Sequence, residues 1–151
     1  MKLAYYKSAV KGSISDILVH KVTCWWTGMK YSHVEVILEE HSDGSVTIAT
    51  SSPRDNGVRT QRLKLKPEHW DIVEYEDLPK SPEEVKKWFK DNEGAKYDYL
   101  GLLGFLFRPY RGHDTRYFCS ESILEALGYT NGWAFHPGHL YYMLKPYEKR
   151  K

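Results

Sequence analysis

The sequence predicts an α+β fold in which helices pack on one side of an antiparallel sheet. Strand-like runs follow one another from Tyr31 to Asp77 with short turns between them, so neighbouring strands can pair antiparallel. One helical pattern precedes these strands, and the others follow after Ser81. This segregation is typical of α+β folds. A length of 151 residues suits one domain covering 1–151.

The chain is predicted to open with an extended segment and a helix. The run "LAYYKSA" from Leu3 is either a short strand or an extended lead-in. A helix is expected to begin at Ser13, because Ser13 and Asp16 match an S-x-x-D capping box and apolar residues follow at helical spacing. Gly28 is placed to end this helix. The apolar residues at helical spacing are Ile17, Leu18, Val22 and Trp25.

Four strands are predicted next. The runs "YSHVEVILEE" and "VTIATSS" flank a Ser-Asp-Gly turn and are predicted to form a β-hairpin. The loop "PRDNG" leads to an alternating run, "VRTQRLKL", as a third strand, and "DIVEYED" is the fourth. Successive strands of this kind favour an antiparallel sheet.

Helices make up the second half. In "SPEEVKKWFKDNEG", Ser81 is the expected N-cap, Pro82 the first helical residue, Glu84 the capping-box partner and Gly94 the stop. The apolar run "YDYLGLLGFLF" is predicted to be a helix despite its two glycines. The run "CSESILEALG" is a helix ended by Gly128, and "PGHLYYML" is a short final helix that opens with a proline.

Composition narrows the classes of partner. Lys and Arg number 22 against 20 Asp and Glu, a net charge of +2, which favours neither nucleic acid nor an acidic partner. The chain contains no HExxH motif, no Cys/His metal-ligand spacing and no complete phosphate-binding loop, so we expect no metal and no cofactor. The two cysteines do not form a CxxC pair, which favours free thiols in a reducing, cytoplasmic setting.

The N-terminal segment "MKLAYYKSAV" lacks the long apolar run of a signal peptide. The longest weakly polar run, "YDYLGLLGFLF", has 11 residues and is too short to span a bilayer. We therefore expect no stable membrane insertion.

Cys119 and His33 are the residues best placed for chemistry. Cys119 begins a predicted helix, where unpaired N–H groups favour a thiolate, and those of Cys119 and Ser120 can hold an oxyanion. Of seven histidines, His33 alone lies inside a predicted strand, where the fold would hold it firmly. The alternatives are that Cys119, like Cys24, is a small buried apolar residue and that His33 is structural.

A third polar group would orient the imidazole. If the hairpin turn pairs Glu40 with Ser45, then His33 lies opposite Ser52, and Glu35 lies opposite Thr50. All of these side chains would then share one face of the sheet, because side chains alternate along a strand. A slip of one residue would move them to the other face.

Five segments in order along the chain carry a further signal. The first, "ISDILVHKVTCWWTGMKYSHVEVIL", joins a helix to a Tyr-Ser-His-Val strand, and "TIATSSPRDNGVR" joins a strand to a Gly-Val turn. "GAKYDYLGLLGF" holds Gly-x-x-Tyr-Asp, "YFCSESILEALG" holds Phe-Cys-Ser-Glu, and "HPGHLYYML" holds Pro-x-x-Leu. Together they span Ile14 to Leu144 and resemble the circularly permuted NlpC-type, papain-like amidases of the YiiX-like group.

The resemblance implies a permuted papain-like fold and a cysteine hydrolase that acts on a peptide, amide or acyl-ester substrate. Cys119 would be the nucleophile and His33 the base. Relatives often take the third residue, a glutamate or histidine, from the strand after the histidine. That strand here offers Thr50, which we favour, with Glu35 or Ser52 as substitutes.

Aromatic residues are expected to line the substrate groove, namely Tyr31, Trp25 and Trp26. Three other functions fit the same resemblance: a lipid acyltransferase, a peptidoglycan peptidase, and a non-catalytic binding module that keeps the fold. The altered third residue motivates the binding module.

Overall fold

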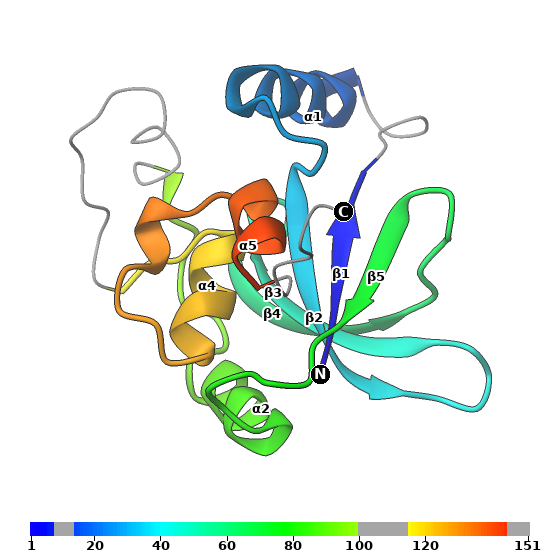
Figure 1. The fold of residues 1–151 in the computed structure, drawn as a ribbon, viewed down its shortest axis with the longest axis vertical. Helices are drawn as coiled ribbons and strands as arrows, with labels where there is room; N and C mark the ends of the chain where they lie inside the picture. The colour runs from blue at the N-terminus through cyan, green and yellow to red at the C-terminus, as the bar shows by residue number, and fades with distance from the viewer. Residues whose placement is uncertain (8–13, 100–114, 145–151) are drawn as a thin grey trace, which may run out of the picture.

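The computed structural model describes residues 1–7, 14–99 and 115–144, with the backbone alone at 14–16, 19 and 26. Five antiparallel strands form one sheet in the order β4-β3-β2-β1-β5 (Figure 1). The strands are β1 (Lys2–Tyr6), β2 (His33–Glu40), β3 (Val46–Ser52), β4 (Gly57–Leu63) and β5 (Trp70–Glu74).

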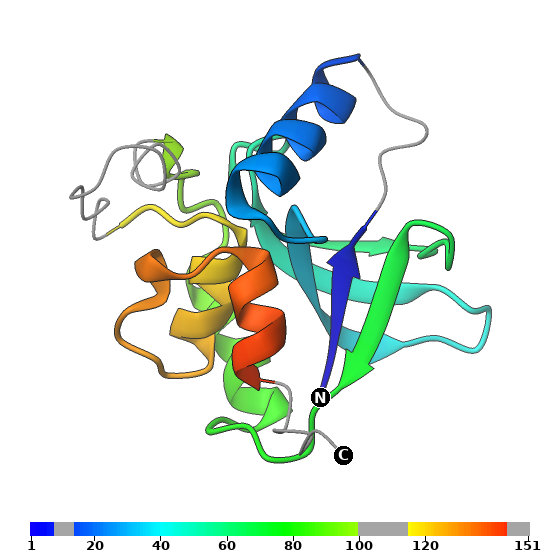
Figure 2. The same cartoon turned by 45° about the horizontal axis from the view of Figure 1, so that its top comes forward.

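Helices α2 (Pro82–Asp91), α4 (Cys119–Ala126) and α5 (Pro137–Leu144) lie on one side of the sheet, and the 3-10 turn η1 (Gly132–Ala134) joins the last two (Figure 2). Helix α1 (Ile14–Thr27) lies near one end of the strands. The predicted α+β class, with an antiparallel sheet and helices on one side, is therefore confirmed. None of the described helices is long and apolar enough to cross a membrane.

The N-terminal run is a strand at the interior of the sheet rather than a lead-in. β1 pairs with β2 on one side and β5 on the other. Its middle residues Leu3, Ala4 and Tyr5 are fully buried. The Tyr5 hydroxyl forms a 2.9 Å hydrogen bond with the hydroxyl of Tyr75, just beyond β5. A continuous apolar run is what a strand needs when both of its faces are covered.

The β2–β3 hairpin forms with nearly the predicted register. Val36 lies opposite Ala49 and Ile37 opposite Ile48, as predicted. The turn itself differs, because Glu40 lies opposite Val46 rather than Ser45, and an irregularity between Ile37 and Glu39 absorbs the difference. A bulge of this kind adds one residue to one strand, which sequence alternation alone does not reveal.

Helix α1 forms where predicted, but the apolar repeat that predicted it faces outward. Leu18, Val22 and Trp25 are 60%, 48% and 79% exposed. Cys24, predicted to be core, is only partly buried, and its sulfur lies 3.8 Å from both ring nitrogens of His20. The predicted cap at Ser13 lies outside the described residues. Helical spacing identified the helix, but it did not identify the buried face.

Helix α2 confirms the capping box: Ser81 accepts a hydrogen bond from the Glu84 N–H, and Glu84 accepts one from the Ser81 N–H. The chain after this helix packs against β4. Ala95 accepts a 2.8 Å hydrogen bond from the Val58 N–H, and a Cβ at Gly57 would lie 1.9 Å from the Ala95 oxygen. Only glycine permits this close approach.

The helix predicted over 97–107 lies mostly outside the described residues. Tyr97 and Asp98 are not helical, because Tyr97 forms a parallel bridge with Tyr117 and the Asp98 N–H donates to the Tyr117 carbonyl, and Tyr99 is the first helical residue. This contact places the Tyr97 segment beside the chain that enters α4. The start of α4 thus adjoins a segment that follows Gly57 by about 40 positions in the sequence.

Candidate functional site

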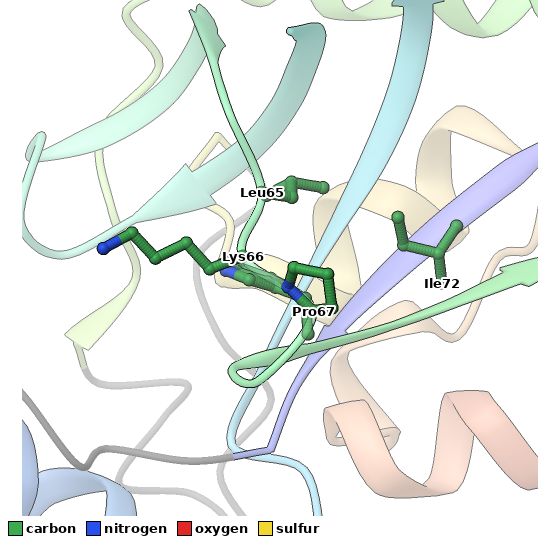
Figure 3. Close-up of a pocket in the computed structure, with 5 residues that line it drawn as sticks. Leu65, Lys66, Pro67 and Ile72 are labelled. Atoms are coloured by element: carbon green, nitrogen blue, oxygen red, sulfur yellow. The ribbon is translucent and has the colours of Figure 1, made fainter. Parts of the chain in front are cut away.

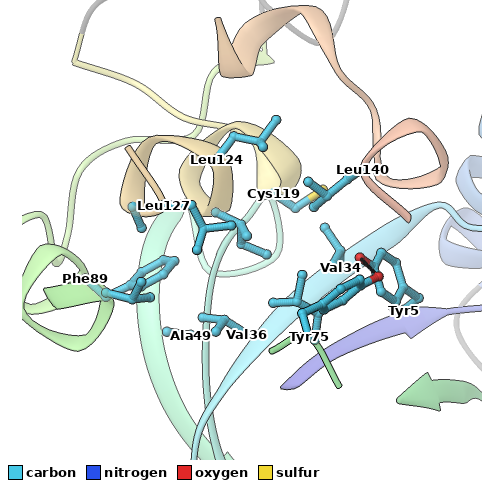
Figure 4. Close-up of a cluster of buried hydrophobic side chains, with 14 of the residues drawn as sticks. Tyr5, Val34, Val36, Ala49, Tyr75, Phe89, Cys119, Leu124, Leu127 and Leu140 are labelled. Carbon is cyan, nitrogen blue, oxygen red and sulfur yellow. Dashed lines mark hydrogen bonds between the residues drawn. The ribbon is translucent and has the colours of Figure 1, made fainter. Parts of the chain in front are cut away.

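Cys119 is the first residue of α4 and lies at the boundary of the main core. Cys119 is 5% exposed, and its side chain lies beside Val34 and Leu140 (Figure 4). The helix begins there because Phe118 is extended and the Glu121 carboxylate accepts a 3.2 Å hydrogen bond from the Phe118 N–H. This bond satisfies one of the donors that a helix start leaves unpaired.

Two serines fix α4 against β3. The Ser51 N–H donates to the Ser122 hydroxyl over 3.2 Å, and that hydroxyl donates to the Cys119 carbonyl over 2.9 Å. The Ser51 hydroxyl donates to the Tyr117 carbonyl. These bonds are buried, so they hold the backbone at Cys119 firmly relative to the sheet.

His33 begins β2, and its ring meets both a thiol and a carboxylate. The imidazole lies close enough to the Cys119 thiol for the sulfur to raise the pKa of the ring. Its Nε2 atom lies 3.2 Å from Oε1 of Glu35, two residues along the strand. Alternation along β2 places His33 and Glu35 on the sheet face opposite Val34 and Val36, which pack under the helices.

The two partners dominate the electrostatics of the imidazole. Burial by itself lowers the pKa of His33, since it disfavours the charged ring. Charge attraction and hydrogen bonding from Cys119, and then from Glu35, outweigh burial and raise the pKa from 6.5 to about 10. A positively charged imidazole is therefore the form that this environment favours at neutral pH.

Thr50 and Ser52 make other hydrogen bonds. The Thr50 hydroxyl donates to the Val34 carbonyl over 2.9 Å, and the Ser52 hydroxyl accepts from the Arg54 N–H over 3.2 Å. Of the three residues named for the third position, Glu35 is the one that the structure brings to the imidazole. It is buried, and it also contacts Arg59 of β4, with Nη2 3.3 Å from Oε1.

The first turn of α4 offers the expected backbone donors. Within the described part of the chain, the N–H groups of Cys119 and Ser120 have no hydrogen-bond acceptor. The Ser120 side chain is committed elsewhere, because its hydroxyl donates to the Phe135 carbonyl over 2.6 Å. Ser120 thus contributes a backbone group rather than a side chain at this position.

The aromatic residues expected in a groove lie in different places. Tyr31 is buried, donates to Asp71 over 2.8 Å and packs against the rings of Tyr5 and Tyr141. Trp25 is on the exposed face of α1, and the side chain of Trp26 lies outside the described residues.

Another aromatic residue, Trp70, contacts the His33 ring with centroids 6.3 Å apart. Trp70 also forms a wall of an apolar hollow on the sheet face that the helices leave uncovered (Figure 3). The other residues lining this hollow are Leu65, Lys66, Pro67 and Ile72.

Three further residues near the site were not identified from the sequence. Arg59 reaches Glu35 from β4. Glu121 is buried, and this burial raises the pKa of its carboxyl to about 8, with the neighbouring Asp98 and Glu125 adding to the effect. Tyr97 is also buried, and burial together with the charge of Cys119 raises its pKa. The alternating sequence pattern predicted a strand at Arg59, but it did not predict the strand pairing that brings Arg59 to Glu35.

Cys24 provides an internal comparison with Cys119. It lies beside His20, but no carboxylate contacts that ring among the bonds that the structure describes, and burial lowers the pKa of His20. Burial also raises the pKa of Cys24 itself. The surroundings of Cys24 therefore favour a neutral thiol and a neutral imidazole.

Fold and site together define an α+β protein with a thiol, an imidazole and a carboxylate in contact where a strand and a helix begin. Comparisons of the chain with protein-family models, curated proteins and solved structures found no match.

Proposed function

We propose that the protein is a cysteine hydrolase of the permuted papain-like type, which cleaves an amide, ester or thioester through an acyl-enzyme. The placement of the His33 imidazole beside both the Cys119 sulfur and the Glu35 carboxylate is the observation that carries this proposal. Glu35 Oε1 lies 3.2 Å from Nε2 of the ring. A thiol activated by a base that a third group orients is the general arrangement for cysteine nucleophiles.

The residues have distinct roles in this reaction. The Cys119 thiolate attacks the carbonyl carbon, and the resulting oxyanion accepts hydrogen bonds from the N–H groups of Cys119 and Ser120. The His33 imidazolium gives its proton to the leaving group as the bond to that group breaks. His33 then takes a proton from water, which attacks the thioester, so that the acid is released and the thiolate and imidazolium are restored.

The resting state in this proposal is an ion pair of thiolate and imidazolium. The raised pKa of His33, to about 10, supports this state because the ring keeps its proton at neutral pH. Glu35 supports it further, since a carboxylate stabilises imidazolium more strongly than a hydroxyl does. This preference favours Glu35 over Thr50 as the orienting residue.

Alkylation with iodoacetamide tests the proposal without knowledge of the natural substrate. We expect Cys119 to be modified faster than Cys24, and His33→Gln to abolish most of this difference, as peptide mass spectrometry would show. An activated ester such as p-nitrophenyl acetate should add an acetyl group to the wild-type protein and not to Cys119→Ala. Cys24→Ala is the matched control and should behave like the wild type. Preferential modification of Cys24 would contradict the proposal.

A non-catalytic binding module is the second candidate, and the low exposure of Cys119, 5%, favours it. In that case the thiol and imidazole stabilise the junction of β2 and α4 without turning over a substrate. Slow alkylation of Cys119 at the rate of an ordinary buried thiol, together with no acetylation, is the result expected for this candidate.

A further inference from the structure

Charged side chains of alternating sign extend from the imidazole across three strands. His33 and Glu35 belong to β2, and Arg59 belongs to β4, on the far side of β3. Arg59 is held in turn by Asp55, which accepts a hydrogen bond from Nε of the guanidinium. The order is Asp55, Arg59, Glu35 and His33, so each charge has a neighbour of opposite sign.

The contacts converge on one oxygen. Nε2 of His33 lies 3.2 Å from Glu35 Oε1, and Nη2 of Arg59 lies 3.3 Å from the same atom. The carboxylate therefore cannot rotate without breaking both contacts. Thr50 lies opposite Arg59 in the β3–β4 pairing, but its hydroxyl is donated to the Val34 carbonyl. That bond leaves the oxygen to the two cationic groups.

Burying the ion pair of Arg59 and Glu35 costs desolvation free energy. The Arg59 side chain is 18% exposed and that of Glu35 4%. Two of their atoms, Glu35 Oε2 and Arg59 Nη1, are buried without a hydrogen-bond partner in the described part of the chain. Buried ion pairs with incomplete hydrogen bonding contribute little net stability, because desolvation offsets the attraction. A role in holding the imidazole explains the pair better than a role in stability.

We propose that Arg59 is a positioning residue that holds the Glu35 carboxylate against the His33 ring, with Asp55 fixing the guanidinium. The inference rests on the proposed function, since the imidazole so held is the base of that reaction. Arg59 touches neither the thiol nor the substrate in this scheme. It acts through Glu35 alone, which makes the effect of its removal conditional on Glu35.

The test combines a spectroscopic and a kinetic measurement on the full chain. The first is the proton NMR signal of the His33 Nε2–H, which a hydrogen bond to a carboxylate moves strongly downfield. We expect this signal to move upfield or vanish in both Glu35→Gln and Arg59→Gln. The second is the rate of Cys119 alkylation by iodoacetamide, which should fall roughly 10- to 100-fold in each variant. The double variant should lose no more than Glu35→Gln alone.

Arg62 offers a matched control in the same strand, since its partners are Ser45 and Asp43. Arg62→Gln should leave the His33 signal and the alkylation rate unchanged. Arg59→Lys keeps the charge but not the planar fork, so it should retain part of the rate. If Arg59→Gln does not fold, Arg59→Lys and Asp55→Asn carry the test, and each should shift the His33 signal in the same direction by a smaller amount.

The outcomes separate this inference from the proposed function. A reactive Cys119 with an unmoved His33 signal in Arg59→Gln overturns the positioning role and leaves the hydrolase proposal standing. Additive losses in the double variant overturn it as well. An unreactive Cys119 in the wild type overturns the proposed function, while a shifted His33 signal in Arg59→Gln still supports the contact from Arg59 through Glu35 to the ring.

Discussion

At the residue scale, His33 shows how neighbours decide the charge of a partly buried group. Burial alone would discharge the ring, yet Cys119 and Glu35 raise its pKa to about 10. His20, with a serine and a thiol as partners, shows a lowered pKa because burial is not opposed. The pKa values of these two histidines therefore move in opposite directions, because Cys119 and then Glu35 oppose the effect of burial at His33 and nothing opposes it at His20.

Glu35 and Thr50 can be separated by conservative substitutions. We expect Glu35→Gln to slow Cys119 alkylation at least about tenfold, because an amide cannot stabilise imidazolium as a carboxylate does. Thr50→Val should slow it less than about twofold, since its hydroxyl bonds the Val34 carbonyl and not the ring.

Thr50→Val should instead cost stability, roughly 1–2 kcal/mol, because the Val34 carbonyl loses a buried donor. Urea titration of both variants checks this difference. A large loss of alkylation rate in a stably folded Thr50→Val would return Thr50 to the position that the sequence comparison favoured.

At the element scale, the sequence predicts some elements fully because local chemistry determines them. The α2 capping box depends on residues that are neighbours in sequence and forms as predicted, and the β2–β3 hairpin forms with the predicted pairing except at its turn. Two features escaped prediction because they depend on distant partners. The interior place of β1 requires knowledge of its pairing with β5, and the outward-facing apolar residues of α1 require knowledge of what α1 packs against.

The candidate site likewise combines residues that the sequence predicted with one that it did not. Cys119 follows from its place at a helix start, and His33 and Glu35 follow from their spacing along one strand. Arg59 belongs to a strand that no local pattern ties to Glu35, since the contact spans 24 positions. Only the assembled sheet, with β3 between the two strands, brings Arg59 within reach.

Gly57 begins β4 and allows the chain that follows α2 to pack closely against that strand. A Cβ there would meet the Ala95 oxygen at 1.9 Å, and the backbone has a φ of 147°. We expect Gly57→Ala to lower the free energy of unfolding by roughly 2–4 kcal/mol, because the 95–97 segment must move away from β4. The move would also disturb the Tyr97–Tyr117 bridge that precedes Cys119.

Gly44→Ala is the matched control, because Gly44 has a φ of 75° with no atom within 4 Å of an added Cβ. It carries backbone strain without a clash, so it should cost only about 1 kcal/mol. Equal losses in the two variants, measured by thermal or urea unfolding, would mean that the contact with Ala95 does not constrain Gly57.

At the scale of the whole molecule, the Glu121 carboxyl and the His33 imidazole bind protons more tightly in the folded chain than in the unfolded chain. Burial raises the pKa of Glu121 from 4.5 to about 8, and partner charges raise that of His33 from 6.5 to about 10. Because the folded state holds more protons in both intervals, its stability must fall as the pH rises through them. Glu121 in the first turn of α4 and His33 at the start of β2 therefore both lower the stability of the fold at alkaline pH.

The two groups can be distinguished because their removal changes stability in opposite directions. Glu121→Gln keeps an acceptor for the Phe118 N–H but cannot ionise, so it should match the wild type near pH 4.5 and exceed it by on the order of 4 kcal/mol at pH about 8. His33→Gln loses the stabilised imidazolium, so it should be less stable than the wild type below pH 6.5, with the difference closing toward pH 10. Urea titrations across this range measure both curves. If the stability gained by Glu121→Gln stays constant with pH, the carboxyl is already charged in the folded protein. If the stability lost by His33→Gln persists at pH 10, the ring contributes through packing and not through its charge.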